Sequence, residues 1–377
     1  MSSNTPFRFY DNRQKYLLFV NTCSEKWETS ERVGAEFDHV RPSPPALRLF
    51  DAGMGDGTVL VRVMRTMHCR YPNIPFYICG KEISLEDVRL CLEKLPDRLY
   101  EHPMTVFVAT NLYYYQAPWL SLQGKGDDMA INWIVLELEG EHSHQFEEQI
   151  TNMQRQIASY WQASASEKTG NPVYTTPTVL VIYRKDQKFV LNDVIPHRGE
   201  KRADFDLVVA SQPYRARVEP KFKVRNVVAP LAKALSVGGR LIGVHSHGND
   251  PGLEIVREVW PDENPFQTNR HMLWDELKTS YPAIAATCSL EEAAHNEAIF
   301  KYGMHTLPSE ISAQPSGIGT STLLAAWNAA VYVAQIDDER LEAAIADGSY
   351  VEATRRKLAE HGGLWFQNEL YTIVRHT

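Results

Sequence analysis

Short apolar runs bounded by turn residues recur along the chain and predict buried strands. They lie at 47–50, 76–79, 104–109, 204–210, 240–244, 300–305 and 364–375. Segments of helical spacing separate several of these runs, at 58–68, 85–95, 224–235 and 252–259. Strands that alternate with helices build a parallel sheet with helices on both faces. The pattern therefore predicts an α/β fold.

Residues 1–45 precede the first core strand and predict an N-terminal helical cap. Their apolar residues near Tyr16 suit a short packed helix, and a second helix is expected at Glu28–Val40, before a proline pair. The cap would cover one end of the core. It could also act as a lid over a ligand, and the side chains that could then reach the ligand are those of Tyr10, Asn12, Arg13 and Tyr16.

Residues 117–202 are a second addition to the alternating core. They predict a strand at 130–139, a helix at 145–161 and two strands at 178–183 and 189–194. We expect an inserted α+β lobe outside the central sheet, which serves substrate binding or dimerisation. The core would then consist of 46–116 and 203–377, with a helical insert near 321–361 made of helices at 321–336, 339–346 and 350–361.

Composition and charge narrow the class of protein. The chain has 377 residues, of which 44% are hydrophobic and 23% charged, as in globular proteins of one large or two smaller domains. Its net charge of −8 argues against a protein that coats nucleic acid or an anionic membrane. Five cysteines without a C-x-x-C motif, no secretory signal and no run of ~20 apolar residues indicate a cytoplasmic protein with reduced thiols and no membrane partner.

The segment Leu47–Leu60, LRLFDAGMGDGTVL, carries the first candidate chemistry. A strand runs into Asp51, and a helix begins at Thr58. Between them lie three glycines, Gly53, Gly55 and Gly57. Glycines let a ligand approach the backbone, and the unpaired N–H groups at a helix start face that ligand. The dinucleotide pattern G-x-G-x-x-G would need a third glycine where this chain has Thr58.

The same segment resembles motif I of the class I S-adenosylmethionine (SAM)-dependent methyltransferases, D-x-G-x-G-x-G with the acid at the strand end. An acid suits SAM, which presents an ammonium and a sulfonium beside its carboxylate. The resemblance covers roughly 46–116, 203–260 and 296–377. It implies a doubly wound, seven-stranded, mostly parallel Rossmann-like sheet whose last strand is antiparallel. It also implies SAM as the cofactor and methyl transfer as the activity.

Two further strand ends complete the expected cofactor site. Glu82 follows the second strand, ~20 residues past the glycine loop, where an acid binds the ribose hydroxyls. Asn111 follows the third strand, at the position that contacts adenine in the methyltransferase pattern. The expected cofactor-binding residues are thus Asp51, Gly53, Gly55, Gly57, Glu82 and Asn111.

The fourth strand indicates the acceptor site. It ends in Ser211-Gln212-Pro213-Tyr214, which resembles motif IV of amino-methylating enzymes, [D/N]-P-P-Y, with Ser211 and Gln212 in place of its first two residues. Tyr214 would position the acceptor. Three consecutive tyrosines, Tyr113 to Tyr115, cannot all face one core, so at least one should lie at a surface or a pocket, where it could line the acceptor site. The expected substrate-binding residues are Tyr113, Tyr115, Ser211, Gln212, Pro213 and Arg215.

His245 and His247, at the end of the fifth strand, are candidates for a base that takes a proton from the acceptor. The pairs His142-x-His144 and His245-x-His247 could instead bind a metal ion, but no metal is expected.

Several functions remain open at this point. A basic cluster, Arg215, Arg217, Lys221, Lys223 and Arg225, could serve an RNA or protein methyltransferase or hold an anionic small substrate. A non-catalytic SAM-binding regulator is a further alternative. We expect a methyltransferase that acts on a small molecule, because the cap, the lobe and the helical insert would close the site on several sides. Nucleic acid is not expected as a partner, and a homodimer through the insert is considered.

Overall fold

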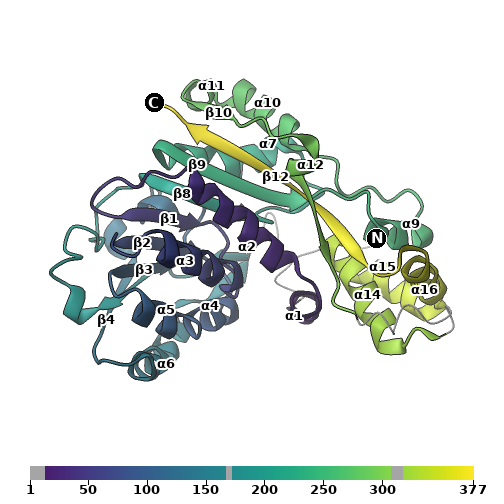
Figure 1. The fold of residues 1–377 in the computed structure, drawn as a ribbon, viewed down its shortest axis with the longest axis horizontal. Coiled ribbons are helices and arrows are strands. Elements are labelled where there is room, and N and C mark those ends of the chain that lie inside the picture. Colours follow the sequence, from purple (N-terminus) through teal and green to yellow (C-terminus); the bar gives the residue numbers. More distant parts are fainter. Residues whose placement is uncertain (1–12, 167–171, 307–316) are drawn as a thin grey trace.

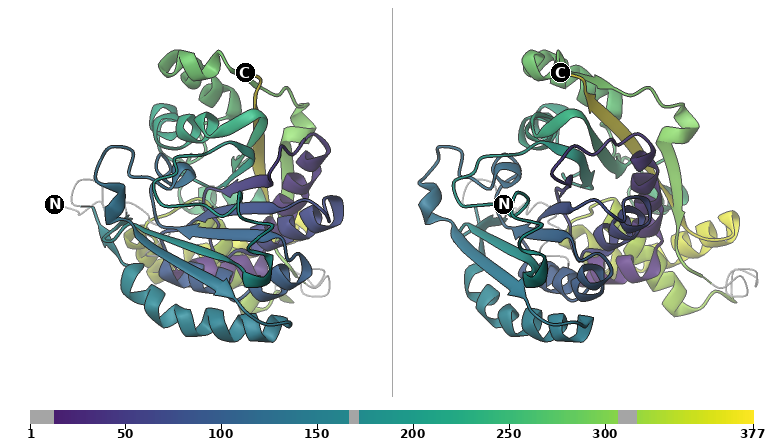
Figure 2. Two further views of the ribbon diagram at one scale, coloured as in Figure 1. Left: turned by 90° about the vertical axis from the view of Figure 1, so that its left-hand side faces the viewer. Right: turned by 60° about the vertical axis from the view of Figure 1, so that its left-hand side comes forward.

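A computed structural model describes residues 13–166, 172–306 and 317–377 (Figure 1). One large mixed sheet crosses the molecule (Figures 1 and 2). Its strands are β1 (Leu47–Asp51), β2 (Phe76–Lys81), β3 (Thr105–Thr110), β4 (Asn132–Leu138), β7 (Thr178–Arg184), β8 (Phe205–Ser211), β9 (Leu235–Ser246), β10 (Cys288–Leu290), β11 (Ile299–Gly303) and β12 (Trp365–Arg375). A small second sheet pairs β5 (Ala163–Ala165) with β6 (Pro172–Tyr174).

The strand order of the large sheet is β10-β12-β9-β8-β1-β2-β3-β7-β4, and β11 also pairs with β12. The strands β9, β8, β1, β2 and β3 run parallel, and β12 lies antiparallel beside β9. The chain winds outward from β1 in both directions, which is the doubly wound arrangement. The expected mostly parallel sheet with an antiparallel last strand is confirmed.

The strands of residues 117–202 belong to this sheet. β7 pairs antiparallel with β3, with Val108 opposite Val181, and β4 continues the sheet beyond β7. The prediction that this insert lies outside the central sheet is therefore wrong, and the sheet is wider than the expected seven strands. The reason is that β3 would otherwise present a row of unpaired N–H and C=O groups. β7 is apolar and buried along most of its length, as suits an inner strand. The exact domain limits and a dimer interface on the insert stay predictions.

Helices cover both faces of the sheet (Figure 2). On one face lie α2, α3, α5 and α6, and on the other α8, α10 and a π-helical turn at Val224–Val228. The helices are α1 (Arg13–Thr22), α2 (Glu25–Ala35), α3 (Thr58–Arg70), α4 (Leu85–Leu92), α5 (Leu95–Glu101), α6 (Ser143–Tyr160), α7 (Pro220–Lys223), α8 (Ala229–Lys233), α9 (Pro251–Val259), α10 (Arg270–Ser280), α11 (Pro282–Ala285), α12 (His295–Ala298), α14 (Thr320–Val333), α15 (Asp338–Asp347) and α16 (Ser349–His361), with short 3-10 turns at Glu36–Asp38, Ala117–Trp119, Asp128–Ala130 and Lys185–Gln187.

Side-chain spacing explains why these elements pack as they do. α3 buries Leu60, Val63, Met64 and Met67, which recur at helical spacing along one face. In β1 the side chains alternate between the two helical layers, so that Leu49 joins the α3 side and Phe50 the opposite side. Both faces of β1 are buried, as expected for the middle of a doubly wound sheet.

A third core lies in a helical lobe made of α9, α14, α15 and α16 (Figure 1). The helices predicted near 321–361 are confirmed there. α1 of the cap joins this lobe, since the rings of Phe19 and Tyr332 lie 5.1 Å apart between centroids. The long strand β12 links the lobe to the sheet, because Phe366 packs in the lobe and Ile373 in the sheet core.

Other details of the local structure differ from the sequence prediction. The two cap helices are confirmed as α1 and α2, whereas Tyr10 and Asn12 lie outside the described residues. The strand predicted at 189–194 is wrong: the chain makes successive turns there, and Phe189 is 93% exposed. The five cysteines are free, and all but Cys69 are buried. Within the described ranges, no helix has the length and apolar character that crossing a membrane requires.

Candidate functional site

A cavity of about 950 Å³ opens beyond the carboxyl ends of β1, β2 and β8. These strands flank the point where the sheet order reverses, which is where open α/β sheets bind their ligands. The cavity wall also includes residues from α1, α2, the segment 113–115 and the end of α14. The cap therefore lies over the strand ends, as predicted, with Tyr16 in the wall.

The glycine loop supplies part of this wall. Gly53 and Gly55 line the cavity, and Gly55 has φ +52°. A Cβ on Gly55 would lie 3.2 Å from the hydroxyl oxygen of Tyr16, so α1 closes tightly over the loop. Gly57 does not line the cavity. A Cβ there would lie 2.6 Å from Sγ of Cys91, so this glycine allows the close packing of α3 on α4. Its position does not support the cofactor contact predicted for it.

Two carboxylates lie at the ends of neighbouring strands, Asp51 buried and Glu82 half-buried. Asp51 accepts a hydrogen bond from the N–H of Gly53 at 3.2 Å, and burial raises its pKa to about 7. Glu82 accepts from the N–H groups of Ile83 at 2.7 Å, Ser84 at 2.9 Å and Gly55 at 3.1 Å. Burial also raises the pKa of Glu82. Both residues line the cavity, where a cationic ligand would relieve the cost of burying their charge.

The start of α3 is occupied by an acid. The carboxylate of Asp56 accepts from the N–H of Thr58 at 3.2 Å and forms ion pairs with Lys26 and Lys94. Burial would raise its pKa, but the two lysines outweigh this effect and hold the pKa well below the ordinary value. An anionic phosphate at this helix start would meet a carboxylate.

Asn111 does not line the cavity, so its position does not support the adenine-binding role predicted for it. Its Nδ2 donates to the carbonyl of Thr176 at 2.8 Å, and its Oδ1 accepts from the N–H of Thr178 at 2.8 Å. The buried amide thus fixes the chain at the entry to β7. These partners come from the insert, whose pairing with β3 the sequence did not reveal.

The predicted acceptor residues meet in the same cavity. Tyr113, Tyr115, Ser211, Gln212, Pro213, Tyr214 and Arg215 all line it. Tyr114, which was not singled out, lines it as well, and its hydroxyl donates to the carbonyl of Pro213 at 3.1 Å. Gln212 has φ +47°, and its Nε2 donates to Glu25 at 2.9 Å.

His245 contacts Tyr214 and does not line this cavity. Its Nδ1 lies 2.7 Å from the Tyr214 hydroxyl, and its Nε2 lies 2.8 Å from Oε2 of Glu369. Burial raises the pKa of Glu369, but hydrogen bonds from His245 and from the N–H of Arg270 outweigh it, so the net pKa is lowered. His247 also lies outside the wall. A direct base role for either histidine is thus not supported by their positions.

The wall also contains charged residues outside the predicted site set, and Glu25 and Lys223 are two of them. Glu25 is at the start of α2, where Asn368 and Gln212 donate to its Oε1, each at 2.9 Å. Lys223 had been counted with the basic cluster, but it is buried in the wall and donates to the carbonyl of Ala216 at 2.8 Å. A sequence signal for Lys223 exists in its two apolar neighbours, Phe222 and Val224, but a helix start in solvent gives the same pattern.

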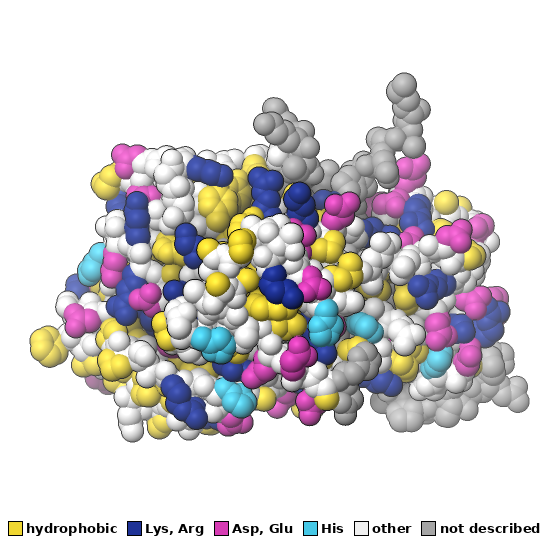
Figure 3. Space-filling model, turned by 90° about the horizontal axis from the view of Figure 1, so that it is seen from above, with side chains coloured by type: hydrophobic (Ala, Val, Ile, Leu, Met, Phe, Trp, Pro, Cys, Tyr) yellow, Lys and Arg dark blue, Asp and Glu magenta, His cyan; other side chains and the backbone are white. Residues whose placement is uncertain are grey.

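The basic cluster 215–225 does not form one exposed surface. Lys223 is buried, and Arg217 forms an ion pair with Glu263 and donates to the carbonyl of Ala334 at 2.8 Å. On the face seen in Figure 3, lysine and arginine side chains are interspersed with acidic, apolar and uncharged polar ones. A continuous basic stripe of the kind that binds nucleic acid is not visible on that face.

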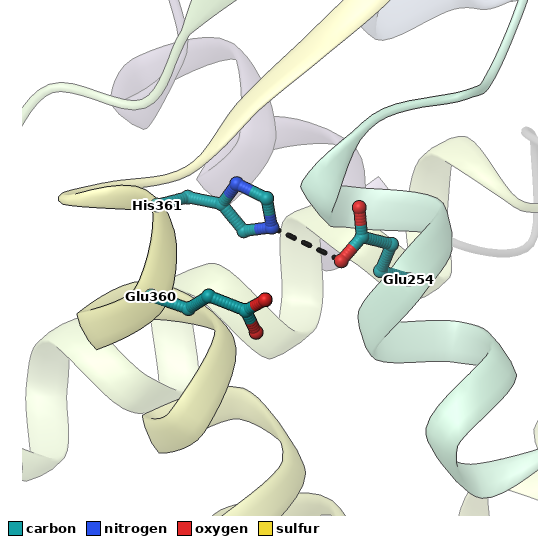
Figure 4. Close-up of side chains that lie close together, drawn as sticks. All are labelled: Glu254, Glu360 and His361. Atoms are coloured by element: carbon teal, nitrogen blue, oxygen red, sulfur yellow. Dashed lines mark hydrogen bonds and ion pairs between the residues drawn. The ribbon is translucent and has the colours of Figure 1, made fainter.

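The two H-x-H pairs are not brought together as metal ligands in the part of the chain that the structure describes. A different group there, Glu254, Glu360 and His361, places three ligand atoms within 4.8 Å of one another (Figure 4). Nε2 of His361 lies 3.0 Å from Glu254, and Lys357 lies 2.8 Å from Glu254 and 3.0 Å from Glu360. The ammonium of Lys357 forms ion pairs with both acids, so the group is an ion-pair cluster between α9 and α16.

No protein-family model and no curated protein matches the chain. Solved structures match most of it at low identity. Loganic acid methyltransferase with S-adenosylhomocysteine (SAH) has 10% identity and a TM-score of 0.38, over 98% of this chain and 96% of that one. Geranyl diphosphate methyltransferase with GPP and sinefungin has 10% identity and a TM-score of 0.35, over 92% and 78%. A Galdieria sulphuraria protein assigned as a sarcosine dimethylglycine methyltransferase has 8% identity and a TM-score of 0.37, over 93% and 86%.

Likenesses at these TM-scores carry no functional argument, so the fold is assigned from the chain's own features. The parallel order β3-β2-β1-β8-β9 and the antiparallel β12 beside β9 are the arrangement that motif I implied. The acid and the glycine loop directly after β1 agree with it. The chain therefore has the fold of the class I, Rossmann-like SAM-dependent methyltransferase superfamily.

Proposed function

We propose that the protein is a methyltransferase that binds SAM in the cavity and methylates a small molecule. The observation that carries the proposal is that Asp51, Gly53, Gly55 and Glu82 line one wall of the cavity at the switch point of the sheet. Two carboxylates in the wall suit the ammonium and the sulfonium of SAM, and a carboxylate at the end of β2 can accept from ribose hydroxyls.

A nicotinamide dinucleotide fits this wall less well. Its pyrophosphate would lie at the start of α3, where the carboxylate of Asp56 accepts from the Thr58 backbone. Thr58 also occupies the position of the third glycine in the dinucleotide pattern. SAM has no pyrophosphate, so the same acid causes no conflict.

When bound, SAM supplies a methyl carbon that its sulfonium activates for in-line displacement. The protein's part is then to align the acceptor with that carbon and to exclude water. Tyr214 lies in the acceptor side of the wall, and its hydroxyl is held by His245. We assign Tyr214 to contact with the acceptor, and His245 and Glu369 to the positioning of Tyr214.

The enclosure of the cavity supports a small acceptor. Side chains of α1, the segment 113–115, residues 172–173 and the end of α14 surround the strand ends. A volume of about 950 Å³ has to hold both SAM and the acceptor, and ligand pockets commonly measure ~300–1,000 Å³. A long polymer would need an open groove in place of these covers.

Calorimetry with SAM, SAH and NAD tests the cofactor. We expect SAM and SAH to bind and NAD not to bind, and tight binding of NAD without SAM would overturn the assignment.

Incubation with methyl-labelled SAM and a metabolite extract, followed by mass spectrometry, tests the acceptor. A labelled small product is expected. Label that appears only in RNA or protein would reject a small acceptor.

A further inference from the structure

The charged residues in the cavity wall divide between two sides. Acids dominate where β1, β2 and α4 meet, with Asp51, Glu82, Glu86 and Asp87, while Glu25 of α2 lies beside Gln212 at the end of β8. The lysines on that side have acidic neighbours: Lys26 forms an ion pair with Asp56, and Lys81 precedes Glu82. The segment after β8 contributes cations instead, Arg215 and Lys223. One side thus suits the positive charges of SAM, and the other side suits a negative charge.

Lys223 is the most telling of these cations, because only 2% of it is exposed. Its Nζ donates to the carbonyl of Ala216 at 2.8 Å and lies 4.9 Å from the ring centroid of Tyr214. An ammonium has three donors, so this bond leaves further donor capacity. Within the described residues, no carboxylate lies in ion-pair range of Lys223, and burial lowers its pKa to about 8. A lysine buried in this way is rare unless it is paired.

The wall around Lys223 is otherwise largely apolar. Val218, Phe222, Val227 and Val333 line the same cavity, and Tyr214 and Tyr332 add aromatic rings. A ligand that fills this side would therefore need an apolar body. It would also need one group that compensates the ammonium, since a charge buried among apolar side chains is costly without a partner.

We propose that the methyl acceptor is an anion with an apolar body, and that its carboxylate or phosphate pairs with Lys223. Arg215, in the same part of the wall, adds positive charge beside this pair. The statement that the bound anion is the methyl acceptor rests on the proposed function. The anion site itself can be tested without methyl transfer.

Matched pairs of small probes test the anion site in the full-length protein with saturating SAH. The carboxylates are benzoate, cinnamate and indole-3-acetate, each compared with its neutral amide, and phenyl phosphate is compared with phenol. Thermal shift and calorimetry measure binding. We expect at least one anion to bind more tightly than its neutral partner. Whether that anion is a carboxylate or the phosphate identifies the group that the site prefers. Equal binding of every anion and its neutral partner would overturn the proposal.

Variants link the effect to Lys223. Lys223→Met should weaken the preferred anion at least about tenfold, the loss expected for one charged hydrogen bond, and should leave its neutral partner and SAH unchanged. Lys223→Arg should keep part of the preference. The matched control is Lys221→Met, because Lys221 is exposed and outside the wall. An anion preference that survives in Lys223→Met would contradict the proposal.

A second experiment separates this inference from the proposed function. A metabolite extract is divided on an anion-exchange column, and each fraction is incubated with methyl-labelled SAM. Label in the retained, anionic fraction supports the inference, and Lys223→Met should lower it. Label found only in the unretained fraction would overturn the proposal of an anionic acceptor but would still support methyltransferase activity. Failure to bind SAM or SAH would overturn the proposed function, and with it the reading of the anion as a methyl acceptor.

Discussion

The hydroxyl of Tyr214 lies 2.7 Å from Nδ1 of His245, whose Nε2 lies 2.8 Å from Glu369. The lowered pKa of Glu369 keeps it ionised, so that Nε2 of His245 donates to it. Nδ1 of the same ring makes the hydrogen bond with the Tyr214 hydroxyl. The chain of bonds begins on β12, crosses β9 and ends at the wall of the cavity. It fixes the one tyrosine that motif IV assigns to the acceptor.

Removing the Tyr214 hydroxyl should slow methyl transfer and spare cofactor binding. We expect Tyr214→Phe to lower kcat/KM about 5- to 50-fold, since one buried hydrogen bond is lost, with SAH affinity near that of the wild type. Glu369→Gln should produce a similar loss. Because the three residues act as one chain, the double variant should lose little more than Tyr214→Phe alone. The control is Glu342→Gln, on the exposed face of α15. Fully additive losses, or an equal loss in the control, would contradict a role for the hydrogen-bond chain from Glu369 through His245 to Tyr214.

Asn111 should be required for stability and not for the cofactor. Asn111→Ala leaves the N–H of Thr178 and the carbonyl of Thr176 without their side-chain partner, which should cost about 1–3 kcal/mol in the free energy of unfolding. Urea unfolding measures this loss, and calorimetry with SAH should find an affinity within about twofold of the wild type. Asn192→Ala, at an exposed turn, is the control. A large loss of SAH binding with normal stability would restore the adenine role.

The placement of Asp51 and Glu82 could be predicted from the sequence, because parallel strands send their carboxyl ends to one edge of a sheet. Asp51 directly follows an apolar run, and Glu82 follows the next run after Gly80 and Lys81, so the order of elements alone locates both acids at that edge. The same reasoning located Ser211 to Arg215, which follow β8 and line the same cavity.

The residues that could not be predicted depend on pairing between distant segments. Asn111 follows β3 as expected, but its amide is used by β7, a strand of the insert. Glu369 lies directly opposite His245 in the antiparallel register of β12 and β9, and nothing local to either strand reveals that register. Lys223 stands in a run of basic residues, which normally marks a solvated helix start. Its burial follows from the packing of the segment after β8.

Replacing Gly57 with alanine should destabilise the fold more than the same replacement at a glycine of similar φ whose Cβ would meet no neighbouring atoms. Gly57 has φ +77°, and its Cβ would lie 2.6 Å from Sγ of Cys91. Gly57→Ala should therefore cost about 2–4 kcal/mol of unfolding free energy, from backbone strain plus overpacking. Gly348, at the end of α15, has φ +72° and nothing within 4 Å of its Cβ, so Gly348→Ala should cost only about 1–2 kcal/mol. Equal losses in urea unfolding would mean that Cys91 is not the constraint.

The raised pKa of Asp51 predicts that SAM binding strengthens as the pH rises. In the free protein the Asp51 carboxyl has a pKa of about 7, against an ordinary value of 3.8, because it is buried. Between these two pH values the folded chain holds a proton that the unfolded chain has lost, so this group's contribution to stability falls as the pH rises towards 7. A cationic ligand favours the ionised form, and its binding expels that proton.

The affinity for SAM should therefore rise about tenfold between pH 6 and pH 8 and level off above the pKa of Asp51. The raised pKa of Glu82 acts in the same direction. SAH, which lacks the sulfonium charge, should respond less, and Asp51→Asn should flatten the SAM profile because the amide does not titrate. Calorimetry at matched ionic strength measures both profiles. An equal rise in wild type and Asp51→Asn would place the titration on another group, and an affinity that falls with pH would show that no buried carboxylate faces the cofactor's positive charge.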